Sequence, residues 1–89
     1  MRLDKYLKVS RLVKRRPIAK ELCDAGRVSV NHRSAKAGHE IKVGDVIELG
    51  YGTKKLQVEV VELRDQASKE KAREMYTVLS EEFTSDSLS

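Results

Sequence analysis

Four basic side chains within six residues, Arg11, Lys14, Arg15 and Arg16, are the group in this sequence best suited to chemistry. A guanidinium can hydrogen-bond two phosphate oxygens at once, while a lysine ammonium supplies a point charge. Pro17 follows directly, and its fixed φ and missing N–H fit the first turn of a helix. The free N–H groups and the dipole at a helix N-terminus also favour an anion. The sequence therefore predicts a phosphate-binding corner between two helices.

Two short helices are expected to position this corner. Leu3, Tyr6 and Leu7 recur at helical spacing and predict an amphipathic helix at the N-terminus. The second helix should begin at Pro17 and end at Gly26, a residue that readily adopts the left-handed conformation found at helix C-termini. The basic corner is then the connection between the two helices.

The middle of the chain has the pattern of a sheet. After Gly26 the apolar residues alternate with polar ones, which predicts strands over 28–30, 46–49 and 56–60. Residues 50–53 are predicted to form the loop of a hairpin between the last two strands. We expect an α+β fold in which the two N-terminal helices pack on one face of a small antiparallel sheet.

The C-terminal part is predicted to be helical. Ser68 is a suitable N-cap, and apolar residues recur from Ala72 to Phe83 at helical spacing. We expect one domain over residues 1–66, a C-terminal helix over 67–83 packed on that domain, and a disordered polar tail over 84–89.

The net charge of +4 conceals a strong segregation along the chain. Residues 1–36 hold eleven Lys or Arg against three acidic residues, a net +8, whereas the remainder is net −4. Like charges packed at one end of a small domain repel one another unless a polyanion relieves them. Nucleic acid is the polyanion that this pattern favours, because Lys and Arg neutralise its phosphates and release counterions.

Nothing in the sequence assembles a catalytic or metal site. The spacing of His32 and His39 fits no standard zinc pattern, and Cys23 lies on the apolar side of the second predicted helix. We therefore expect no enzymatic activity, no metal and no cofactor. A single cysteine excludes an internal disulfide, and no apolar run reaches the roughly 18 residues of a membrane span. These features are typical of a cytoplasmic protein.

Several linked segments resemble the S-four (αL) RNA-binding domain of ribosomal small-subunit protein four. The resemblance covers residues 1 to about 50 and rests on Arg2–Leu7, Lys14–Arg16, Ala19, Gly26–Asn31, Ala35–Lys36 and Val43–Asp45. With its short length and the segments 8–16 and 75–79, the chain is most similar to the RqcP group of ribosome-associated quality control proteins, relatives of a ribosome-associated heat-shock family.

This resemblance implies binding to the large ribosomal subunit that still carries peptidyl-tRNA after a stalled ribosome splits. It also implies contacts with ribosomal RNA and tRNA, and assistance to a partner factor that adds C-terminal alanine tails. Arg2 and Arg16 would be the principal RNA contacts. The full candidate set is Arg2, Lys5, Lys8, Arg11, Lys14, Arg15, Arg16, Lys20 and Lys36. We expect a monomer that binds neither membrane nor DNA.

One position departs from the family pattern. The family usually has Asn-Gly at the turn after the first strand, whereas this chain has Asn31-His32. Either His32 adopts a conformation that glycine accepts more easily, or the turn is of another type.

Other functions remain open at this point. A protein-interaction module could use an acidic C-terminal helix, and a pull-down that survives reversal of Arg2 and Arg16 to Glu would favour it. A general ribosome assembly or heat-shock RNA-binding factor is a further alternative. DNA binding by a helix-turn-helix is a weaker one, because the second helix has few base-reading side chains.

Overall fold

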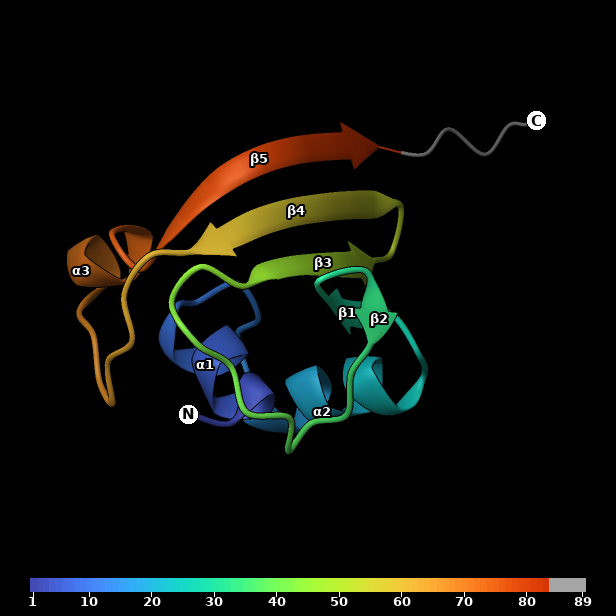
Figure 1. Cartoon of the computed structure of the whole chain (residues 1–89), viewed down its shortest axis with the longest axis horizontal. Helices are drawn as coiled ribbons and strands as arrows, with labels where there is room; N and C mark the ends of the chain where they lie inside the picture. Colours follow the sequence, from blue (N-terminus) through green and yellow to red (C-terminus); the bar gives the residue numbers. More distant parts are fainter. Residues whose placement is uncertain (84–89) are drawn as a thin grey trace.

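The structure of the chain is a computed structural model, and it describes residues 1–83. Its elements follow one another as α1 (Leu3–Val9), α2 (Arg16–Asp24), β1 (Val28–Val30), β2 (Arg33–Ser34), β3 (Val46–Tyr51), β4 (Lys54–Val60), α3 (Lys69–Arg73) and β5 (Tyr76–Phe83). All strand pairs are antiparallel, and the sheet order is β2-β1-β3-β4-β5. The predicted α+β class with helices and an antiparallel sheet is confirmed. Figure 1 shows α1 and α2 together on one side of the molecule and β5 at the far edge of the sheet.

The two N-terminal helices form as their apolar spacing predicts. Leu3, Tyr6 and Leu7 of α1 are fully buried, and so is Ala19 of α2. Helix α2 begins one residue before Pro17, and the chain leaves it through Gly26 with a φ of 74°. This left-handed residue turns the chain from α2 directly into β1.

The sheet contributes the other half of the core. Val28 and Val30 of β1 pair with Leu49 and Ile47 of β3, and all four side chains are buried with the helices in one cluster. Because successive strand residues point to opposite faces, the residues between them form a polar outer face. The helices thus cover only one face of the sheet, as expected.

A long connection, residues 35–45, fixes the start of α1. The backbone N–H of Leu3 donates to the carbonyl of His39 at 2.8 Å, and that of Asp4 to the carbonyl of Ala37 at 3.1 Å. These bonds satisfy N–H groups in the first turn of α1 that have no partner inside the helix. The Glu40 carboxylate pairs with the N-terminal ammonium of Met1, and the backbone of Glu40 forms an isolated antiparallel β-bridge with that of Arg2. The long connection therefore fixes the backbone before Arg2, at Met1, and after it, at Leu3.

The predicted helix over 67–83 is wrong for most of its length. Ser68 does cap a helix, since its side chain accepts a hydrogen bond from the Lys71 N–H, but α3 ends at Arg73. Residues 76–83 instead form β5 along the outer edge of β4. An unpaired β4 would leave a row of open backbone groups, and the β-branched and aromatic residues at 76–78 suit a strand. Leu79 and Phe83, expected in a helical core, are exposed.

The C-terminal extension nevertheless packs on the domain. Met75 is fully buried in the common core, and its carbonyl accepts a hydrogen bond of 2.7 Å from the hydroxyl of Tyr6. The predicted loop over 50–53 is shorter than expected, because β3 continues to Tyr51 and β4 starts at Lys54. The disordered tail predicted for residues 84–89 lies outside the described residues.

Candidate nucleic-acid interface

Arg2 and Arg16 meet at one buried carboxylate. The Nε of Arg2 lies 3.1 Å from Oδ1 of Asp4, and the Nε of Arg16 lies 3.1 Å from Oδ2. A second Arg16 nitrogen, Nη2, lies 3.5 Å from Oδ1 of the same residue. Asp4 itself is only 3% exposed, while about half of each arginine side chain remains exposed. The carboxylate therefore holds the inner edges of two guanidinium groups and leaves the outer parts open to a ligand.

The charge of Asp4 is stabilised by its neighbours. Burial on its own raises the pKa of this carboxyl, but the hydrogen bonds from Arg16 and Arg2, the charge of Arg16 and the Lys5 backbone N–H outweigh burial and lower it below 3.8. With Asp4 ionised, the cluster keeps one net positive charge. Gly38 lies beside the cluster, where a Cβ would be in ordinary van der Waals contact, at 3.6 Å, with the guanidinium carbon of Arg2.

The N-terminus of α2 opens beside this cluster. Arg15 is its N-cap in an extended conformation, and no side chain caps the first turn. The N–H groups of that turn are thus available to an anion, with the helix dipole in the favourable direction. Arg15 and Arg16 are themselves the first residues of this terminus, so basic side chains and free backbone donors belong to the same short segment.

The connection between α1 and α2 carries a second basic group, around a hollow of about 630 Å³. Lys8, Arg11 and Lys14 line one side, and Lys69, at the start of α3, lines another. Arg11 is held with a φ of 63°, at the position after the helix end where glycine is usual. Lys69 is not among the candidates from the sequence, because only the return of the C-terminal extension brings it to α1.

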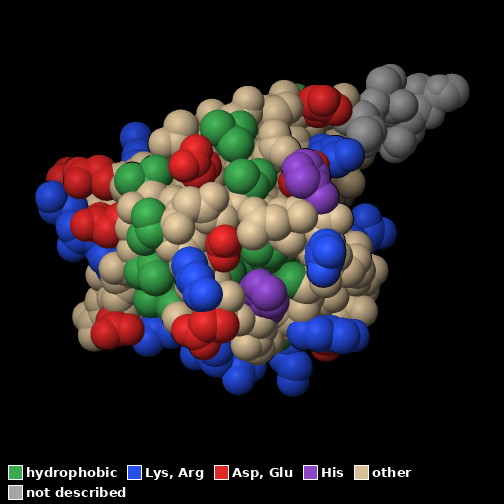
Figure 2. All heavy atoms as spheres, viewed as in Figure 1, with side chains coloured by type: hydrophobic (Ala, Val, Ile, Leu, Met, Phe, Trp, Pro, Cys, Tyr) green, Lys and Arg blue, Asp and Glu red, His purple; other side chains and the backbone are tan. Residues whose placement is uncertain are grey.

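The remaining candidates differ in their surroundings. Lys5 is paired with Asp65 at 2.9 Å, so that part of its charge is already neutralised. Lys20 on α2 and Lys36 in the long connection are exposed and lie outside this hollow. In Figure 2, Lys and Arg side chains gather along the lower rim of the molecule, which is the side that holds α1 and α2 in Figure 1.

Comparison with known proteins decides the family. The S4 domain matches residues 1–47, which include all nine candidate residues. A protein of Bacillus subtilis named RQC P-site tRNA stabilizing factor is 54% identical over 82 residues, which cover 92% of this chain and 95% of the relative. A protein of the same name from Listeria innocua is 51% identical over 87 residues, covering 98% and 95%. The chain belongs to the S4-domain family of RQC P-site tRNA stabilizing factors.

The fold of this family member is also similar to a solved heat-shock protein. A trimeric structure of Vibrio cholerae heat shock protein 15 superposes with a TM-score of 0.84 at 27% identity, covering 90% of this chain and 82% of the other. The resemblance stated from the sequence is therefore confirmed.

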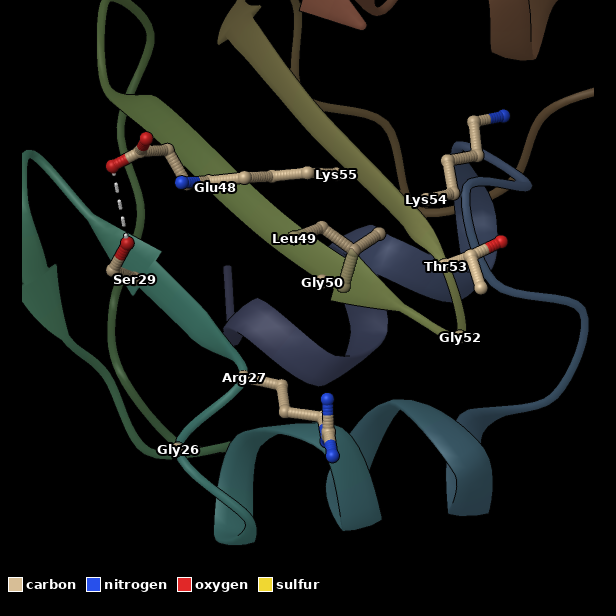
Figure 3. A pocket seen from close by; sticks show the side chains of 10 residues that line it. All are labelled: Gly26, Arg27, Ser29, Glu48, Leu49, Gly50, Gly52, Thr53, Lys54 and Lys55. Atoms are coloured by element: carbon tan, nitrogen blue, oxygen red, sulfur yellow. Dashed lines mark hydrogen bonds between the residues drawn. The ribbon is translucent and has the colours of Figure 1, made fainter. Parts of the chain in front are cut away.

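A different hollow, of about 440 Å³, lies where β1 meets the β3–β4 hairpin. Figure 3 shows Lys55 reaching across β3 toward Glu48, whose Oε1 accepts a hydrogen bond of 3.4 Å from the Ser29 hydroxyl. Arg27, Lys54 and Lys55 also line this hollow, but none of the nine candidate residues from the sequence lies in it.

Among the described residues no cluster of three or more His, Cys, Asp or Glu side chains could hold a metal ion. Burial raises the pKa of the Cys23 thiol to about 11, with a further contribution from nearby carboxylates, so that the thiol is protonated at neutral pH. No helix within residues 1–83 is both long and apolar enough to cross a membrane.

Proposed function

We propose that this chain is a non-catalytic RNA-binding protein of the large ribosomal subunit, which contacts ribosomal RNA and peptidyl-tRNA after a stalled ribosome has split. In this role it supports a partner factor that extends the nascent chain with C-terminal alanine, and it acts as a monomer in the cytoplasm. The names of its relatives, RQC P-site tRNA stabilizing factor, support this role.

The observation that carries the proposal is the Arg2–Asp4–Arg16 cluster beside the uncapped N-terminus of α2. Two arginines separated by fourteen positions are oriented by one buried carboxylate rather than left as mobile surface cations. Holding a guanidinium in place lowers the entropy lost when it binds a phosphate. A folded RNA, whose phosphates have fixed spacing, is the ligand that gains most from such an arrangement.

The alternative of an acidic C-terminal interaction helix loses its structural basis. Helix α3 spans only five residues, three of which are basic, and the rest of the expected helix is strand β5. A general heat-shock RNA-binding role remains the second candidate, because of the structural similarity to heat shock protein 15.

Arg16→Ala tests the proposed function. The variant should lose co-sedimentation with large ribosomal subunits in a sucrose gradient. Its thermal midpoint should fall by only part of the loss expected when Asp4 itself is neutralised, because Arg2 still pairs with Asp4. Arg73→Ala, an exposed cation on α3, is the matched control and should still co-sediment. Retention of Arg16→Ala in the subunit fraction would contradict the proposal. Subunits that carry peptidyl-tRNA should bind more protein than empty ones, and equal binding would favour the general heat-shock role.

A further inference from the structure

A hollow of about 410 Å³ lies between the α1–α2 connection and the β3–β4 hairpin, apart from the arginine cluster. Its lining is apolar at the bottom and basic at the rim. Leu49 and Leu56 are buried side chains of the core, and Leu12 packs against that core. Arg11, Lys14 and Lys54 are the basic lining residues. A hollow of this size can hold one nucleotide or one large side chain.

Tyr51 gives this hollow an aromatic wall. It pairs with Lys54 across the β3–β4 hairpin, and Lys54 pairs in turn with Phe83 on β5. Directly opposed residues of antiparallel strands point to the same face, so the three side chains form one row across the sheet. The Tyr51 and Phe83 side chains are 48% and 71% exposed, whereas Tyr6 is fully buried. Figure 3 shows Lys54 leaving β4 in a different direction from Lys55, on the side of the α1–α2 connection.

The charged residues around the hollow indicate which kind of ligand would fit it. Lys54 is paired with Glu81 at 2.8 Å, but within residues 1–83 no ion pair is formed by Arg11 or Lys14. Two free cations at the rim of an apolar, aromatic-walled hollow match a planar base that carries a phosphate. An apolar peptide side chain would fill the bottom of the hollow but leave both cations without a partner.

The backbone at Arg11 gives a second indication. A φ of 63° is unfavourable for any residue with a Cβ, and glycine would occupy this helix end without strain. The chain instead places an arginine there, next to the hollow. The arginine is thus kept at a cost in backbone strain that glycine would avoid, as happens where the side chain itself has a role.

We propose that this hollow binds one unstacked nucleotide of an RNA strand, with the base on Tyr51 and its phosphate on Arg11 and Lys14. The proposal rests on the RNA-binding function proposed above and adds a contact beyond the Arg2–Asp4–Arg16 cluster. The chain would then hold folded RNA at the helices and a single-stranded residue beside the hairpin. Recognition by stacking requires little sequence specificity, because every base presents a π-face.

Fluorescence can test the site directly, because the chain contains no tryptophan. In Tyr51→Trp the indole is the only such reporter, and titration with a hexanucleotide of adenosine should quench its emission in a saturable manner. Quenching should persist when Arg16→Ala is added, because the two sites are separate, and should weaken at least fivefold in apparent affinity when Lys14→Ala is added. The absence of saturable quenching would overturn the proposal.

Substitutions at Tyr51 separate stacking from apolar burial. For binding to large ribosomal subunits we expect Tyr51→Phe to match the unsubstituted chain and Tyr51→Leu to bind about tenfold more weakly, a loss typical of one base–aromatic stack. Full affinity of Tyr51→Leu would overturn the base-stacking proposal and favour an apolar protein side chain as the occupant. The Arg11→Gly variant should also bind more weakly, although its thermal midpoint is at least as high as that of the unsubstituted chain. Unchanged affinity in this variant would count against a phosphate contact from Arg11.

Failure of this proposal can be distinguished from failure of the proposed function. If Tyr51→Leu binds subunits normally while Arg16→Ala does not, the ribosomal role stands and only the nucleotide site is lost. If Tyr51→Trp is quenched by the hexanucleotide but the unsubstituted chain does not bind subunits, the nucleotide site stands and the ribosomal role fails.

Discussion

At the scale of the single residue, Asp4 is the side chain that gives the basic surface its geometry. Two arginines brought together without a counter-charge would repel each other and point into solvent. Asp4 offsets that repulsion and fixes one edge of each guanidinium, at distances of 3.1 Å. In the sequence, this carboxylate is only one of three negative charges within residues 1–36. Its partners lie two positions before it and twelve after it, and only the packing of α2 beside α1 brings Arg16 to it.

The pH dependence of unfolding should reveal this role. Because the folded-state pKa of Asp4 lies below its ordinary value, the stabilisation is complete above that value and is lost as the pH falls through the folded-state pKa. We expect Asp4→Asn to lower the free energy of unfolding by about 2 kcal/mol at pH 7, as for a charged hydrogen bond. The difference between the two chains, measured by urea denaturation, should shrink below about pH 4.

The control for this prediction is Asp65→Asn. Asp65 pairs with Lys5, but its side chain is 85% exposed, and exposed pairs contribute little to stability. A pH-independent difference for Asp4→Asn, or an equal effect of Asp65→Asn, would show that Asp4 does not act through its ionised form.

At the scale of the element, the turn between β1 and β2 resolves the one departure from the family pattern. Asn31 and His32 both have positive φ, 53° and 70°, which is the conformation of a two-residue turn of type I′. His32 therefore adopts the geometry that glycine accepts more easily, which was one of the two outcomes expected. Its Nδ1 lies 3.4 Å from Oε1 of Glu48, but the His32 side chain is 75% exposed, so this contact compensates little.

His32→Gly should stabilise the protein. Glycine removes the steric cost of the left-handed conformation, partly offset by its greater freedom in the unfolded chain, and we expect a net gain of about 0.5–1 kcal/mol. In a domain of this size that corresponds to a rise of about 4 °C in the thermal midpoint measured by circular dichroism. Ser34→Gly, in the neighbouring strand, is the matched control and should lower the midpoint. A lower midpoint for His32→Gly would mean that the histidine makes a contact which outweighs its strain.

Helices and strands were predictable from the sequence where the spacing of apolar residues favours the same structure as the packing of the folded chain. The periodicity of Leu3, Tyr6 and Leu7 and the left-handed Gly26 predicted α1 and the end of α2, and both are present. The segment 76–83 failed because its apolar residues fit a helical period by coincidence, while the open edge of β4 determined its structure. The spacing of apolar residues within 76–83 carries no information about a sheet edge formed by residues 16 to 29 positions earlier.

At the scale of the whole molecule, the nine predicted RNA contacts come from one part of the chain. All of them lie within residues 1–47, the segment that matches the S4 domain. The sequence could locate this basic region but could not sort its members, because pairing depends on the fold. Lys5 is paired with Asp65, sixty positions away, whereas Lys14 forms no ion pair within residues 1–83.

This difference predicts how salt should weaken binding. Each phosphate neutralised by a free cation contributes about 0.7 to 0.9 to the slope of log affinity against log salt concentration. Lys14→Ala should therefore lower the slope for large-subunit ribosomal RNA, measured by filter binding, by about that amount. Lys5→Ala should lower it by much less, because Asp65 already competes for the ammonium, and Asp65→Asn should make the slope steeper by freeing Lys5. Equal slopes for Lys14→Ala and Lys5→Ala would show that RNA displaces Asp65 fully, so that both lysines reach phosphates in the bound state.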